Sequence, residues 1–131
     1  MPNDSKDAPQ KRKRVNVRRP DVMALVQEQV EQHYRSSIVE KIKSHGGEIT
    51  VGNTSIRLAK QFGFCYGVER AIDLAYATRK VFPDQRIFLI GEIIHNPEVN
   101  KQLSDMGIIS LPWKQMSKEY DDLTDEDVVI V

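Results

Sequence analysis

The sequence is poor in cysteine, in tryptophan and in long apolar runs. Of its 131 residues one is cysteine and one is tryptophan. One cysteine excludes a disulfide within the chain, which fits a reducing compartment, the cytoplasm or a plastid. No apolar stretch approaches the ~20 residues that a membrane helix needs. The polar, basic start of the sequence lacks the apolar centre of a secretory signal peptide. We therefore expect a soluble globular chain without a membrane partner.

The net charge is zero, but the charges are unevenly distributed. Residues 1–20 carry seven Lys or Arg and two Asp, which leaves 12 basic and 17 acidic residues in the rest of the chain. This segment offers little to bury, so residues 1–20 are predicted to form a disordered basic tail. Such a tail can bind nucleic acid or another acidic partner. No aromatic residue lies among its basic residues to stack on bases, so nucleic-acid binding is not expected.

Residues 21–54 are predicted to form a helix and a hairpin. Pro20-Asp21 is typical of a helix start and Gly46-Gly47 of a helix end. Between them, apolar residues recur at spacings of three and four, and these are Val22, Leu25, Val26, Val30, Tyr34, Ile38 and Ile42. We expect one continuous helix on the outside of the domain, with His33 and His45 as surface or helix-end residues. Gly52-Asn53 then separates two strand-like runs, which is a hairpin signal.

From residue 55 onwards, strand-like and helical patterns alternate. Strands are expected at 55–60, 86–90, 108–109 and 127–131, and helices at 68–82 and 97–106, the second capped by Asn96 and Pro97. This order predicts the α/β class, a small parallel sheet with flanking helices. Trp113, in the connection from Leu111 to Thr124, is expected to cover the core. The last strand has no following turn or cap, so we expect the N-terminal piece of a longer protein or a truncated product.

The only cysteine, Cys65, lies between a predicted strand and a predicted helix, flanked by Gly63 and Gly67. A helix N-terminus favours the thiolate, which is both a nucleophile and a metal ligand. His95 follows the next strand. Neighbouring parallel strands end at one edge of a sheet, so Cys65 and His95 are predicted to share that edge. A lone cysteine is more often a small buried residue, and a lone histidine more often a loop residue, but a shared edge favours function.

Two motifs carry a family resemblance. Phe62 to Ile72 resembles the Gly-Phe-Cys-x-Gly-Val-x-Arg-Ala motif of the LytB/IspH family, and Gly91 to Val99 resembles that family's second motif, a strand followed by His-Asn and a helix. The spacing between the motifs also matches. The resemblance covers residues 55–131, and residues 21–54 look like an N-terminal extension carried by a subset of the family.

The resemblance implies one lobe of a three-lobed reductase. Members of the family convert 4-hydroxy-3-methylbut-2-enyl diphosphate, an allylic diphosphate, to isopentenyl and dimethylallyl diphosphate in the non-mevalonate isoprenoid pathway. They use a [4Fe–4S] cluster and an electron donor protein or reduced cofactor. By position, Cys65 would be the first cluster ligand and His95 would contact the diphosphate. The family needs two further cysteines, which this chain lacks, so the chain alone is expected to be inactive.

Two other functions remain open from the residues alone. One is a non-catalytic α/β binding module whose basic N-terminal arm contacts an acidic partner. The other is a thiol enzyme that uses Cys65 by itself. The chain has no Cys-x-x-Cys pair and no clear base next to Cys65, so the sequence favours the thiol enzyme least.

Overall fold

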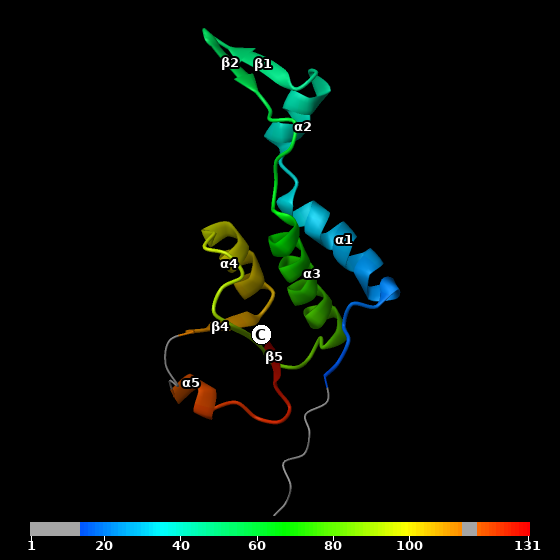
Figure 1. Ribbon diagram of the computed structural model, residues 1–131, viewed down its shortest axis with the longest axis vertical. Helices are drawn as coiled ribbons and strands as arrows, with labels where there is room; N and C mark the ends of the chain where they lie inside the picture. The colour runs from blue at the N-terminus through cyan, green and yellow to red at the C-terminus, as the bar shows by residue number, and fades with distance from the viewer. Residues whose placement is uncertain (1–13, 114–117) are drawn as a thin grey trace, which may run out of the picture.

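The computed structural model describes residues 14–113 and 118–131 (Figure 1). Its elements, in chain order, are α1 (Pro20–Tyr34), α2 (Ser37–Ser44), β1 (Glu48–Val51), β2 (Thr54–Arg57), α3 (Tyr66–Val81), β3 (Ile87–Ile90), α4 (Pro97–Asp105), β4 (Ile108–Leu111), α5 (Lys118–Asp121) and β5 (Val128–Ile130). Within this described part, no helix has the length and apolar character that crossing a membrane requires.

The body of the molecule is built on a three-stranded parallel sheet. Its order is β4-β3-β5, with Ile87 of β3 in register with Ile108 of β4 and Val128 of β5. The connection from β3 through α4 to β4 is a strand–helix–strand crossover, the unit that parallel strands require. The α/β class and the small parallel sheet are therefore confirmed.

Helices α3 and α4 lie on one face of this sheet, and α1 forms a further layer on α3. Helix α1 packs along α3, and α4 lies beside α3 over the strands (Figure 1). The buried core between helices and sheet comprises Val17, Val22, Val26, Ile72, Ala75, Tyr76, Ala77, Ile87, Leu89, Val99, Leu103, Ile108 and Ile130. Helix α3 contributes the largest share of these, as expected for a helix that is apolar over most of its circumference.

One arginine joins the C-terminal ends of α3 and α4. Arg79 donates from Nε to the Met106 carbonyl at 2.9 Å and from Nη2 to the Gly107 carbonyl at 2.8 Å. Its Nη1 donates to the carbonyls of Phe82, Pro83 and Gln85 at 3.2, 3.2 and 2.9 Å. Carbonyls at helix ends lack intrahelical partners, so this single side chain satisfies groups from both helices.

The predicted continuous helix over 21–45 is wrong, because two helices occupy this stretch. Arg35 is extended, with φ −69° and ψ 125°, and ends α1. Ser36 is also extended, and its Oγ accepts a hydrogen bond from the Val39 amide at 3.3 Å, which caps α2. A serine that caps its own downstream turn starts a new helix rather than continuing the old one.

The hairpin is confirmed, but the predicted strand at 55–60 does not belong to the parallel sheet. Among the described residues β2 pairs only with β1, antiparallel, with Ile49 opposite Ile56. Together α2, β1 and β2 form a unit that projects from one end of the body (Figure 1). The chain returns from it through residues 58–65, which lead into α3.

Trp113 does not cover the core, since 74% of its surface is exposed. The connection that contains it also includes the short helix α5, which the sequence pattern did not predict. Residues 1–13, most of the predicted basic tail, and residues 114–117 lie outside the described residues.

Candidate functional site

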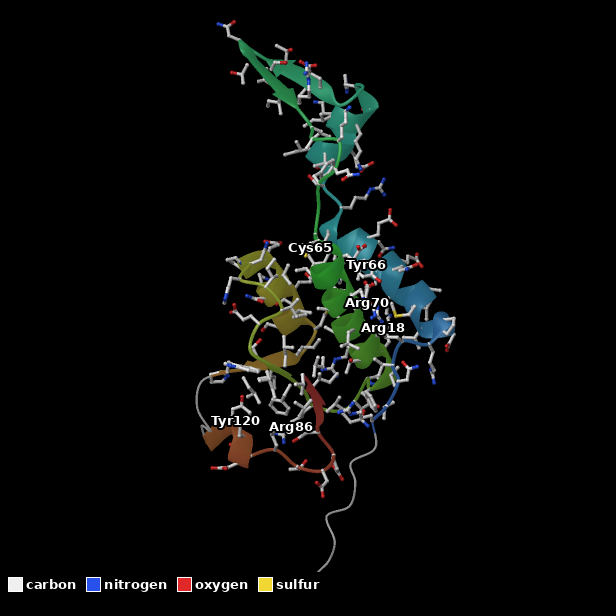
Figure 2. All side chains as sticks on the ribbon, in the orientation of Figure 1. Arg18, Cys65, Tyr66, Arg70, Arg86 and Tyr120 are labelled. Atoms are coloured by element: carbon white, nitrogen blue, oxygen red, sulfur yellow. The ribbon has the colours of Figure 1, made fainter. Side chains whose placement is uncertain are left out.

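Cys65 is the N-cap residue of α3, and its thiol is free and exposed (Figure 2). Its backbone is extended, with φ −67° and ψ 159°, and its carbonyl accepts the first helical hydrogen bond, from the Glu69 amide at 3.0 Å. The side chain makes no capping hydrogen bond. The first amides of this 16-residue helix therefore have no side-chain acceptor from Cys65, and a negatively charged group is stabilised beside them.

The glycines beside Cys65 keep this end of α3 open. Gly63 has φ +120°, a backbone conformation that side chains disfavour. A Cβ added at Gly63 or Gly67 would meet no atom within 4 Å. A small side chain at either glycine would therefore meet no more distant part of the described chain.

Tyr66 and Arg70 form a pair on the exposed first turn of α3 (Figure 2). The Arg70 Nη1 donates to the Tyr66 hydroxyl at 2.8 Å, and the guanidinium lies 5.3 Å from the ring centroid. Tyr66 remains 71% exposed. The four-residue spacing on a helix is the signal that could have predicted this pair.

His95 lies in the loop after β3, with a side chain that is 98% exposed. Its Nδ1 donates to Glu92 Oε2 at 2.7 Å, since a carboxylate only accepts. This hydrogen bond occupies Nδ1 and leaves Nε2 available for a ligand. Sequence reasoning missed Glu92, although an acidic residue three positions before a histidine could have indicated it.

Asn96 caps α4, as its sequence predicts. Its Oδ1 accepts from the Glu98 amide at 3.0 Å and from the Val99 amide at 3.2 Å. These two donors at the N-terminus of α4 are therefore already used by the protein. Because Cys65 makes no such bond, the open helix start of the site is that of α3 rather than α4.

Cys65 and His95 come to the same end of the body by a route different from the predicted one. The N-terminal ends of α3 and α4 both lie towards the projecting hairpin (Figure 1). His95 reaches this end by following β3, as predicted, because α4 begins at the carboxyl end of that strand. Cys65 reaches it at the start of α3 and follows no strand of the sheet, because β2 lies outside that sheet.

The site offers one thiol rather than a complete metal centre. Across residues 14–113 and 118–131, no group of three or more His, Cys, Asp or Glu side chains is placed to hold a metal ion. An exposed thiol on an open helix start suits a single ligand to a metal cluster. The remaining ligands of a cluster would have to come from elsewhere.

Comparison with known proteins defines the class. The model of the family described as LytB protein matches residues 56–131, more than half of the chain, and the chain belongs to this family. No solved structure matches the chain significantly.

Its curated relatives include cyanobacterial proteins named 4-hydroxy-3-methylbut-2-enyl diphosphate reductase. The chain is 45% identical to that of Synechococcus sp. strain WH7803 over 102 residues, 78% of this chain and 26% of the relative. It is 45% identical to that of Gloeothece citriformis over 98 residues, 75% of this chain and 24% of the relative. It is 42% identical to that of Nostoc sp. strain PCC 7120 over 108 residues, 82% of this chain and 27% of the relative.

The extent of these matches has two consequences. The chain spans about a quarter of the length of the curated relatives that it matches. The family match covers 76 residues, whereas the Synechococcus match covers 102, so at least 26 aligned residues precede residue 56. That relative therefore shares part of the segment that forms α1, α2 and the hairpin.

Proposed function

We propose that this chain is the first lobe of a 4-hydroxy-3-methylbut-2-enyl diphosphate reductase and that Cys65 is one ligand of its [4Fe–4S] cluster. The observation that carries the proposal is the free, exposed thiol of Cys65 at the open start of α3, inside the family match. A buried structural cysteine would need none of these features. The domain boundaries that follow are a tail at 1–20, an extension at 21–54 and the lobe at 55–131.

One thiolate cannot hold a four-iron cluster, and this chain contains one cysteine. The other cluster ligands would come from further residues of a longer protein, so the 131-residue chain by itself is inactive. When bound, the cluster supplies electrons and a Lewis-acidic iron for removal of the allylic hydroxyl group. The chain's own contribution is to hold the Cys65 sulfur at the N-terminus of α3, where the helix dipole stabilises negative charge.

His95 is proposed to bind the diphosphate of the substrate. Its Nδ1 is held by Glu92 at 2.7 Å, and its ring is almost fully exposed. With Nδ1 held in this way, a protonated imidazole presents Nε2–H as a donor to a phosphate oxygen. Glu92 acts through His95 and is a positioning residue.

The overall reaction also defines a second partner. Breaking the allylic C–O bond and replacing it with C–H consumes two electrons and two protons and releases water. The electrons must come from a donor protein or a reduced cofactor.

Reconstitution of the complete protein under anaerobic conditions tests the ligand role. Cys65→Ala is expected to abolish the brown chromophore and bound iron, while the melting temperature of the apoprotein is unchanged because the cysteine is exposed. Ser104→Ala, an exposed change on α4, is the matched control and should retain the cluster. A full-strength cluster in Cys65→Ala would rule out the assignment.

Steady-state kinetics of the complete protein test His95. His95→Asn is expected to raise KM for the diphosphate substrate by ~10- to 100-fold, the value of a lost charge-assisted hydrogen bond, and to leave the cluster spectrum unchanged. Glu92→Gln should give a smaller effect, because the ring remains but is no longer oriented. An unchanged KM in His95→Asn would exclude the substrate-binding role.

A further inference from the structure

The last turn of α1 contacts both helices whose N-terminal ends lie next to Cys65 and His95. His33 Nδ1 lies 2.7 Å from the hydroxyl of Tyr76 on α3 and 2.9 Å from the side-chain nitrogen of Gln102 on α4. Tyr76 is fully buried, and its ring centroid lies 5.5 Å from that of His33. The C-terminal end of α1 is therefore held against the body beside the start of α3 (Figure 1).

Tyr34, the final residue of α1, extends this contact to the loop that carries Cys65. Its ring meets the Phe64 ring edge to face, with centroids 5.2 Å apart and ring planes at 88°. Both side chains are half-buried and pack against the core. The arrangement is favourable because the positive edge of one ring meets the negative face of the other. Phe64 directly precedes Cys65, so Tyr34 holds the chain neighbour of the thiol-bearing residue.

Phe64 is the anchor of this loop. Residues 59–63 and 65–67 are exposed, whereas Phe64 between them is half-buried. Residues 59–64 form no main-chain hydrogen bond with any other residue that the structure describes. The Cys65 side chain makes no capping bond, and Gly63 has no side chain to pack. The position of Cys65 therefore depends on the Phe64 ring on one side and on the first turn of α3 on the other.

We infer that Tyr34 is a positioning residue for Cys65, which acts through Phe64 to hold the thiolate in place for the [4Fe–4S] cluster. The inference rests on the proposed function, which makes Cys65 a cluster ligand. A metal ligand needs a geometry that packing around it keeps fixed. Tyr34 lies outside residues 56–131, which the family match covers, whereas Phe64 and Cys65 lie inside them. The contact therefore gives the segment before the lobe a part in orienting the ligand.

A spin label on Cys65 tests the inference, because Cys65 is the only cysteine of the chain and its thiol is exposed. Electron paramagnetic resonance of a nitroxide at this position reports the motion of the loop. Tyr34→Leu keeps an apolar side chain but removes the ring. In the 131-residue chain it should raise the ratio of mobile to ordered label ~2- to 10-fold, the equivalent of one lost aromatic pair. Tyr34→Phe keeps the ring and should match wild type.

Tyr120→Leu is the matched control. Tyr120 is another half-buried tyrosine on a helix, and Figure 2 shows it at the opposite end of the body from Cys65. This substitution should leave the label spectrum unchanged. In the complete protein, reconstituted with its cluster, Tyr34→Leu should release iron to a chelator ~2- to 10-fold faster than wild type. Iron release from Tyr34→Phe should follow wild type.

An unchanged label spectrum in Tyr34→Leu overturns the inference. Equal label mobility in Tyr34→Phe and Tyr34→Leu also overturns it, since the ring would then not be what holds the loop. The same rise in Tyr120→Leu would show a general loss of stability and overturns it as well. Equal iron release from Tyr34→Leu and wild type overturns the link from the loop to the cluster.

The label experiment needs no cluster, so its result is separate from the proposed function. A full-strength cluster in Cys65→Ala would sink the proposed function, and the label spectra would still decide whether Tyr34 orders the loop. An unchanged spectrum in Tyr34→Leu together with a lost cluster in Cys65→Ala would sink the positioning role alone.

Discussion

Arg86 and Asp127 form a two-point ion pair that ties the start of β3 to the start of β5. Arg86 Nε donates to Asp127 Oδ1 at 2.8 Å, and Nη2 donates to Oδ2 at 2.6 Å. The Asp127 carboxylate is 4% exposed and also accepts from the Thr124 amide at 2.8 Å. The paired geometry, more specific than a single contact, fixes where β5 enters the sheet.

Asp127→Asn is expected to reduce stability at neutral pH and to change its acid dependence. Hydrogen bonds from Arg86, and then from Thr124, lower the pKa of Asp127 in the folded protein. Its stabilisation is therefore complete above the unfolded pKa of about 3.9 and is lost as pH falls through the lower folded pKa. Melting temperatures of wild type and Asp127→Asn, measured by circular dichroism from pH 7 to pH 3, should therefore converge at acid pH. Asp125→Asn, at an exposed position nearby, is the control, and its melting temperature should follow that of wild type at every pH. A difference in melting temperature between wild type and Asp127→Asn that stays constant from pH 7 to pH 3 would contradict the prediction.

Arg79→Met is expected to lower the free energy of unfolding by about 2–4 kcal/mol. The change removes the five hydrogen bonds from the guanidinium and leaves carbonyls at two helix ends without their donor. Urea denaturation of the 131-residue chain measures the difference. Lys80→Met, at the next and exposed position, should change stability by less than about 0.5 kcal/mol. Equal effects of the two substitutions would show that the contacts of Arg79 are not made in solution.

Asn96→Ala is expected to destabilise α4 by about 1 kcal/mol, the usual cost of losing an N-cap side chain. In the wild type, Asn96 Oδ1 accepts hydrogen bonds from the amides of Glu98 and Val99, and the change leaves both amides without this acceptor. Hydrogen exchange at these two amides should accelerate, while exchange in α3 stays unchanged. Asn96→Asp keeps a capping oxygen and should restore most of the stability; if it does not, the side chain acts by some means other than capping.

The Cys65 thiol is expected to react with Ellman's reagent in the native 131-residue chain as readily as in denaturant, because it is exposed. Cys65→Ala should change the free energy of unfolding by less than about 0.5 kcal/mol, as is usual for surface substitutions. A reaction that occurs only after unfolding would show that the thiol is buried, and the ligand role would then lose its structural basis.

Most local elements could be predicted from the sequence, because their signals are local. Gly52-Asn53 specifies the hairpin, and Asn96-Pro97 specifies the start of α4. The break at Arg35 and Ser36 was missed because apolar spacing continues across it. Only the Ser36 hydroxyl, which accepts from the Val39 amide, marks the new start.

Pairing between distant segments could not be read from the sequence in the same way. The pattern of β2 indicates a strand but not the strand with which it pairs. It pairs with β1, from which two residues separate it, because a short connecting loop costs the least chain entropy to close. The exposure of Trp113 likewise depends on neighbours that no local pattern encodes. Cys65 and His95 were predicted to share a sheet edge because each was expected to follow a strand of one parallel sheet. Only His95 does so, since β2 lies outside that sheet, and the start of α3 is what brings Cys65 to this end of the body.

The position of Arg79 has an electrostatic consequence for the opposite end of these two helices. One cation sits among carbonyls at the C-terminal ends of both α3 and α4, so the negative poles of two macrodipoles are compensated together. The positive poles, which point towards Cys65 and His95, receive no such compensation from Arg79. An anionic ligand at that end therefore meets the open start of α3, whereas the first amides of α4 are already bonded to Asn96.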